Sequence, residues 1–138
     1  MATSDYATVT EILASAKNIA VVGLSSNHYR SSFGVSESLQ MSGYRIFPVN
    51  PNETEVLGEK AYARLEDIPE KIDIVDIFRR SEFVPEIVDS AMHIGARAIW
   101  MQEGVEDEAS AERARRAGLY VAVNRCIAKD IYIRRKRT

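Results

Sequence analysis

The chain has 138 residues, of which 46% are hydrophobic and 28% are charged, and its formal net charge is −2. This length suits one domain with a substantial buried core, and the nearly balanced charge argues against a general nucleic-acid binder. The single cysteine, Cys126, excludes an internal disulfide framework, and no run approaches the roughly 20 apolar residues of a membrane-spanning helix. We therefore expect a cytoplasmic protein without nucleic-acid or membrane partners.

The first predicted element is an amphipathic helix that follows Thr3, because Ile12, Leu13 and Ala16 recur at helical spacing. After it, short apolar runs alternate with helical stretches. The apolar runs predict strands near residues 19–24, 45–49, 73–78, 97–101 and 119–123.

Helical stretches separate most of these strands, near residues 32–42, 82–94 and 107–117. Between Pro51 and Asp67 the periodicity is weak and indicates a turn and a short helical piece. The alternation predicts an α/β fold: one doubly wound, Rossmann-like domain over residues 1–138, with a mostly parallel five-stranded sheet and helices on both faces.

Each predicted strand ends at small, amide or basic residues. In a parallel sheet these ends meet at one edge, where open α/β sheets bind their ligands. The edge is therefore the predicted ligand site, and its chemistry suits a phosphorylated ligand. The residues that follow the strands include Gly23, Ser25, Asn50, Pro51, Arg79, Gln102, Gly104 and Asn124.

The loop after the first strand is a candidate phosphate site. Arg30, Ser31 and Ser32 precede a helix, so a guanidinium, hydroxyls and the N–H groups of the helix start are expected to face an anion. The loop lacks both the GxGxxG dinucleotide fingerprint and the glycine-lysine loop of nucleoside triphosphatases. The alternative is that Gly23 and the serines only turn and cap the chain.

The end of the second strand, Val49-Asn50-Pro51-Asn52, lacks the acid that usually binds the ribose hydroxyls of NAD. A neutral amide does not repel an additional ribose phosphate, which makes NAD a less favoured ligand. The alternative is an Asx turn in which Asn50 serves only its own backbone.

Few other side chains suggest chemistry. We expect Arg79 rather than Arg80 to face a ligand, because neighbouring strand positions point to opposite sides of a sheet. Trp100 is interpreted as a core aromatic. His28 and His93 are too far apart for a catalytic triad and belong to no metal-binding cluster, so neither catalytic residues nor a metal site are predicted.

Ordered blocks along nearly the whole chain carry a resemblance to a known family. They are Val21-Val22-Gly23-Leu24-Ser25, Arg30-Ser31-Ser32, Pro48-Val49-Asn50-Pro51, Leu57-Gly58, Asp73 to Arg80, Trp100 to Val105 and Asn124-Arg125-Cys126. Together they resemble the small CoA-binding proteins whose fold matches the CoA-binding domain of the succinyl-CoA synthetase alpha subunit. The tail, residues 126–138, is the least typical part, and Asn124 stands where similar proteins often have aspartate.

The resemblance implies a protein that binds CoA or an acyl-CoA at the carboxyl-end edge of the sheet, without catalysis of its own. The alternatives are the nucleotide-binding component of an acyl-CoA ligase, with a partner protein supplying the catalytic domain, and an NAD(P)-binding enzyme. The residues implied to bind are Gly23, Ser25, Arg30 and Ser32 at the phosphates, Asn50 and Pro51 at the adenosine, and Phe78, Arg79, Gln102 and Gly104 toward the pantetheine, with Asn124 at the same edge.

Overall fold

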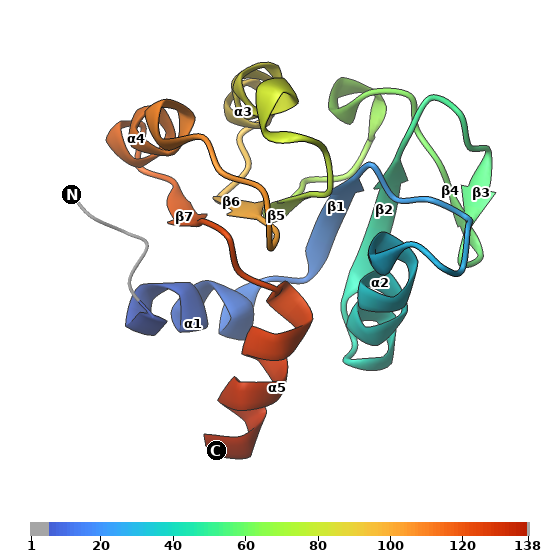
Figure 1. Cartoon of the computed structure of the whole chain (residues 1–138), viewed down its shortest axis with the longest axis horizontal. Coiled ribbons are helices and arrows are strands. Elements are labelled where there is room, and N and C mark those ends of the chain that lie inside the picture. Colours follow the sequence, from blue (N-terminus) through green and yellow to red (C-terminus); the bar gives the residue numbers. More distant parts are fainter. Residues whose placement is uncertain (1–5, 138) are drawn as a thin grey trace.

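The centre of the molecule is a parallel sheet, as the apolar runs predict. The computed structural model describes residues 6–137, and the sheet has five strands in the order β2-β1-β5-β6-β7 (Figure 1). The strands are β1 (Asn18–Val22), β2 (Arg45–Val49), β5 (Ile74–Ile77), β6 (Ala98–Met101) and β7 (Tyr120–Ala122).

Helices cover both faces of this sheet (Figure 1). One face packs against α3 and α4, and the other packs against α1, α2 and α5, so that each face has its own apolar core. The predicted Rossmann-like α/β class is therefore confirmed. The helices are α1 (Tyr6–Ser15), α2 (Ser31–Met41), α3 (Val84–His93), α4 (Glu108–Arg116) and α5 (Ile127–Arg137), with short 3₁₀ helices at Leu65–Asp67 and Ser81–Phe83.

The first strand is shorter than predicted, because it ends at Val22 rather than at residue 24. Gly23 has a φ of +91°, a left-handed conformation that leaves the extended path of the strand. Trp100 is buried as expected, with 1% of its surface exposed. The predicted start of the first helix after Thr3 lies outside the described residues.

Two features of the structure were not predicted. The turn at Leu57-Gly58 joins two short antiparallel strands, β3 (Glu55–Val56) and β4 (Glu59–Lys60). The C-terminal tail forms α5, whose Ile127 and Ile131 are buried one helical turn apart in the core beneath the sheet. No helix within residues 6–137 has the length and apolarity needed to cross a membrane.

Candidate functional site

The strand order places a crevice at the carboxyl end of the sheet. α2, which follows β1, and α3, which follows β5, lie on opposite faces, so the chain connections diverge between these two neighbouring strands. Ligands of open α/β sheets bind at this kind of switch point. A cavity of about 650 Å³ lies there, with Gly23, Asn50 and Phe78 from the ends of three strands in its lining.

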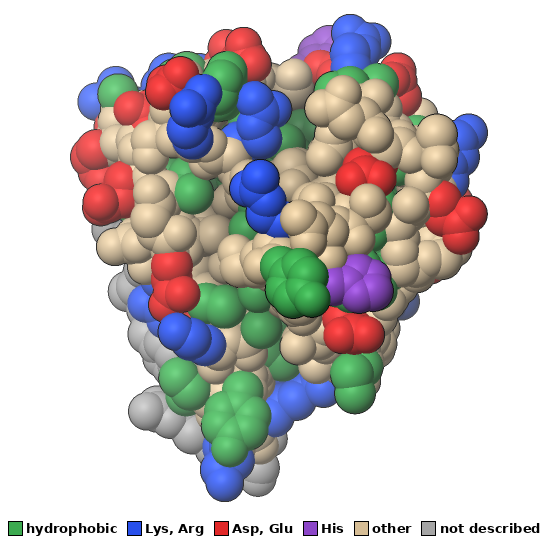
Figure 2. All heavy atoms as spheres, turned by 45° about the vertical axis from the view of Figure 1, so that its right-hand side comes forward, with side chains coloured by type: hydrophobic (Ala, Val, Ile, Leu, Met, Phe, Trp, Pro, Cys, Tyr) green, Lys and Arg blue, Asp and Glu red, His purple; other side chains and the backbone are tan. Residues whose placement is uncertain are grey.

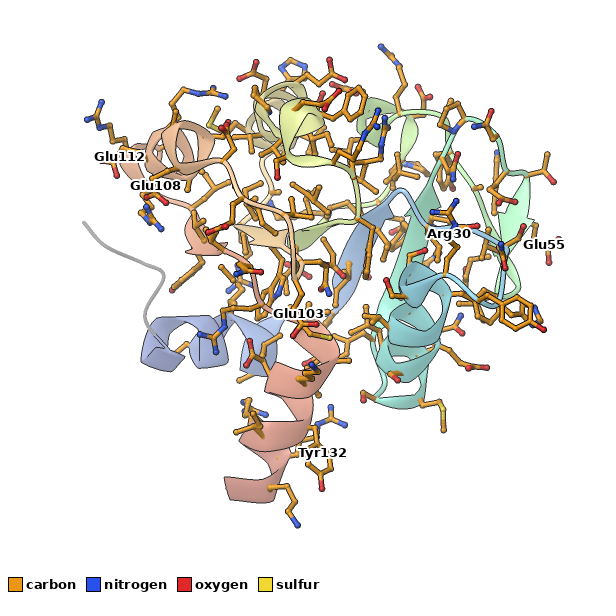
Figure 3. All side chains as sticks on the ribbon, viewed as in Figure 1. Arg30, Glu55, Glu103, Glu108, Glu112 and Tyr132 are labelled. Carbon is orange, nitrogen blue, oxygen red and sulfur yellow. The ribbon has the colours of Figure 1, made fainter. Side chains whose placement is uncertain are left out.

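The lining of this larger cavity is basic. Arg30, Arg79 and Arg80 contribute to it, together with Ser31 and Ser32 at the start of α2, and no acidic side chain is among the described residues that line it. Figure 2 shows basic side chains gathered beside a hollow in the upper part of this face, and Figure 3 shows Arg30 above the N-terminal end of α2. Because the helix start adds partial positive charge, the cavity suits an anion.

Gly23 permits the close approach of the strand ends. A Cβ atom at this position would lie 2.7 Å from the Phe78 carbonyl oxygen and 3.1 Å from Cδ of Arg79. The Gly23 N–H donates a hydrogen bond of 2.8 Å to the Val49 carbonyl, and the Phe78 N–H donates one of 2.9 Å to the Val22 carbonyl. A larger residue would therefore push apart the loops that form the floor of the cavity.

Serine hydroxyls fix the loop between β1 and α2. The Ser25 N–H donates to Oγ of Ser32 at 3.1 Å, and the Asn27 N–H donates to Oγ of Ser25 at 3.0 Å. The N–H and the hydroxyl of Ser26 both donate to Oε2 of Glu53, at 2.8 and 2.9 Å. These hydrogen bonds give the loop a defined shape.

Asn50 has a structural role as well as a place in the cavity lining. Its Oδ1 accepts a hydrogen bond of 3.0 Å from the Asn52 N–H, so the predicted Asx turn is present, but the side chain does not serve only its own backbone. Its Nδ2 donates to the Leu24 carbonyl at 3.0 Å and so ties the loops after β1 and β2 together.

The strand alternation that was expected to separate the two arginines after β5 does not extend to them. Arg79 and Arg80 both line the larger cavity, because β5 ends at Ile77 and strict strand alternation no longer applies beyond it. Phe83 was not predicted as a site residue. It lines the same cavity, and its ring centroid lies 4.2 Å from the guanidinium carbon of Arg79. An aromatic residue four positions after an arginine is a weak hint of this contact in the sequence, and the spacing alone does not determine it.

A second cavity of about 350 Å³ continues along the same edge. It shares Ser31, Phe78, Arg79 and Arg80 with the first cavity and adds Val35, Gln102, Glu103, Gly104, Val105 and Cys126. Oε1 of Gln102 accepts a hydrogen bond of 3.1 Å from the Ile127 N–H, so this side chain also anchors the start of α5.

All the residues implied to bind CoA line one of these cavities, with the exception of Asn124. Asn124 has a φ of +57°, and its Oδ1 accepts a hydrogen bond of 2.7 Å from the Gly104 N–H. His28 stacks on Phe33 outside both linings. Within residues 6–137 no group of three or more His, Cys, Asp or Glu side chains is arranged to hold a metal ion.

The fold and this edge define a Rossmann-like domain with a basic cavity at its switch point. Residues 17–131 match the family described as the CoA binding domain, and the chain belongs to this family. The family resemblance inferred from the sequence blocks is thereby confirmed.

Relatives of two different lengths are similar to this chain. The uncharacterized protein YneT of Bacillus subtilis is 41% identical over 121 residues, a match that covers 88% of this chain and 90% of YneT. The ADP-forming acetate–CoA ligase II of Archaeoglobus fulgidus is 32% identical over 95 residues, which are 67% of this chain but 14% of the ligase. A solved structure of a hypothetical protein from Pyrococcus horikoshii superposes with a TM-score of 0.89 at 36% identity, covering 94% of this chain and 91% of that protein.

Proposed function

We propose that the chain binds CoA or an acyl-CoA across the two adjacent cavities and performs no chemistry on it. The observation that carries the proposal is the larger cavity, where three arginines and the start of α2 meet without an acidic side chain among the described lining residues. CoA presents a diphosphate and a ribose phosphate, and guanidinium groups and helix N–H groups are suited to bind both.

The order of the residues along the edge supports one orientation of the ligand. Ser25, Arg30 and Ser32 would hold the phosphates, and Asn50 and Pro51 would border the adenosine. The pantetheine arm would then pass Phe78 and Arg79 into the smaller cavity, where Gln102 and Gly104 lie. Asn124 would act indirectly, because it holds the Gly104 backbone.

The side chains around the smaller cavity support binding without catalysis. Cys126 and Ser31 are the nucleophilic side chains in its lining, and neither described histidine lies there to serve as a base. Glu103 is exposed and pairs with Lys129 at 2.9 Å. General acid–base or covalent chemistry requires a nucleophile and a base within hydrogen-bond reach, which this lining does not provide.

Calorimetric titration with CoA tests the proposal. We expect saturable binding to the wild-type protein, and a loss of about tenfold or more in affinity for Arg30→Ala, because a charge-assisted hydrogen bond is worth about 1.5–3 kcal/mol. Arg116→Ala is the matched control, since Arg116 is an exposed arginine on α4 that pairs with Glu112 away from the cavities. Dephospho-CoA should bind more weakly than CoA if the ribose phosphate is recognised.

Absence of saturable binding at millimolar CoA would contradict the proposal. Equal losses in Arg30→Ala and Arg116→Ala would also count against the site, because general loss of positive charge would then explain the result. Binding of dephospho-CoA with the affinity of CoA would exclude recognition of the ribose phosphate.

The similarity to the acetate–CoA ligase of Archaeoglobus fulgidus favours a second candidate, a nucleotide-binding component of an acyl-CoA ligase. Because this chain spans 14% of that ligase, other protein would have to supply the remaining parts. Formation of acetyl-CoA by a mixture with a co-purified partner, and by neither component alone, would support this function. Unchanged CoA and no product in the mixture would speak against it.

A further inference from the structure

Phe83 is an aromatic side chain in the lining of the larger cavity for which the proposed function has no role yet. It ends the 3₁₀ helix Ser81–Phe83 directly before α3, and it is partly buried. Its ring contacts two cavity arginines: the guanidinium carbon of Arg79 lies 4.2 Å from the ring centroid, and that of Arg80 lies 5.6 Å from it.

The side chain of Arg79 passes close to Gly23 and ends over an aromatic ring. A Cβ at Gly23 would lie 3.1 Å from Cδ of Arg79, and the Arg79 guanidinium lies over Phe83. Within residues 6–137 the Arg79 guanidinium has neither an ion pair nor a hydrogen bond to a protein group. The ring is therefore the group that orients this charge.

Two other arginines in the fold are oriented by carboxylates. Arg125 donates two hydrogen bonds of 2.8 Å to the carboxylate of Asp130, and Arg97 pairs with Asp73 at 3.4 Å. A carboxylate orients a guanidinium but also neutralises it and occupies its N–H donors. An aromatic face attracts the cation through the ring quadrupole and leaves the in-plane donors available.

We propose that Phe83 is a positioning residue that holds Arg79 at the cavity wall with its charge and its donors directed to a phosphate of the ligand. This inference rests on the proposed function, since the phosphate would belong to CoA. It adds a residue to the binding site that acts through Arg79 rather than by contact with the ligand.

A double-mutant cycle measured by CoA titration tests the role. Phe83→Leu should weaken CoA binding about two- to fivefold, the effect expected for loss of one partly exposed cation–π contact. Phe83→Tyr keeps the ring and should bind within about twofold of the wild type. In an Arg79→Ala background, Phe83→Leu should cause a clearly smaller loss, because Arg79 is gone and only the more distant Arg80 remains over the ring. Phe83→Met provides a second variant without a ring, should Phe83→Leu not fold.

A ligand-free measurement separates this inference from the proposed function. The Nε–Hε resonance of Arg79, assigned with Arg79→Lys, should lose its ring-current shift in Phe83→Leu and keep it in Phe83→Tyr. A wild type that fails to bind CoA would overturn the proposed function, whereas an unchanged Arg79 resonance in Phe83→Leu would overturn the positioning role. Wild-type CoA affinity in Phe83→Leu, or an equal loss with and without Arg79, would also refute it.

Discussion

Asp76 should make the protein less stable as the pH rises, and replacement by asparagine should remove this effect. Asp76 lies on β5, is fully buried, and neither of its carboxylate oxygens has a hydrogen-bond partner within residues 6–137. Its register neighbours on the adjacent strands are Val21 and Trp100, so its surroundings on the sheet are apolar. Burial raises the pKa of the Asp76 carboxyl well above its usual value of 3.8.

The sign of the effect follows from the protons bound in each state. Below pH 3.8 both the folded and the unfolded chain carry the Asp76 proton, and stability is not reduced. Above it the unfolded chain loses the proton while the folded chain keeps it, so the free energy of unfolding falls by about 1.4 kcal/mol per pH unit until the raised pKa is reached. Asp76→Asn has no titrating proton at this position. The free energy of unfolding of Asp76→Asn minus that of the wild type should therefore rise by about 1.4 kcal/mol per pH unit over the same range.

Urea unfolding at one-unit pH steps from pH 4 upward measures this difference, because contributions from other groups cancel between the two proteins. Asp73→Asn is a control of opposite sign. Burial raises the pKa of Asp73, but hydrogen bonds from the N–H groups of Asn18 and Lys17 and from Arg97 outweigh this effect and lower it. Asp73→Asn should therefore be destabilised at neutral pH and approach the wild type as the pH falls. Parallel stability profiles for the wild type and Asp76→Asn would refute the reasoning.

Substitutions at three other positions give further tests by urea or thermal unfolding. Gly23→Ala should lower the free energy of unfolding by about 1–3 kcal/mol, because the added Cβ meets the Phe78 carbonyl at 2.7 Å in a left-handed backbone. Gly34→Ala should raise it by roughly 0.5–1 kcal/mol, because Gly34 lies inside α2 with open space around it. Equal effects of the two would contradict the close approach at Gly23. Asn124→Ala should lower the free energy of unfolding by about 1 kcal/mol, because it removes the acceptor for the Gly104 N–H. Asn124→Asp keeps an acceptor and should stay within about 0.5 kcal/mol of the wild type. Similar losses in both variants would show that this hydrogen bond is not the cause.

The order of strands and helices could be predicted because buried parallel strands appear as continuous apolar runs. Gly43, Gly95 and Gly118 follow the ends of α2, α3 and α4, and each has a positive φ that favours glycine at such an end. The same periodicity missed α5, because its buried residues, Ile127 and Ile131, are followed by a run of basic side chains that hides the apolar stripe. The β3-β4 hairpin was missed because each of its strands has two residues, too few for an alternating pattern.

The candidate site could be located from the sequence, but its internal contacts could not. Strand ends meet in every parallel sheet, so residues such as Asn50 and Gln102 could be assigned to one edge. Whether their amides face a ligand or the protein depends on loop geometry, and both form hydrogen bonds to backbone groups. The contact between Arg79 and Phe83 depends on how the 3₁₀ helix orients a ring, which residue spacing alone does not determine.

The distribution of ion pairs adds an argument for an anionic ligand at this edge. Several arginines in the fold pair with an acidic side chain: Arg45, Arg64, Arg80, Arg97, Arg113, Arg115, Arg116 and Arg125. One of them, Arg80, lines the larger cavity. Arg30 and Arg79 have no such partner within residues 6–137, although the chain as a whole carries a formal net charge of −2. Like charges close together repel, so two unpaired arginines beside one cavity raise the energy of the free protein. A bound phosphate would relieve this repulsion. Binding of a phosphorylated ligand should therefore raise the free energy of unfolding of the protein.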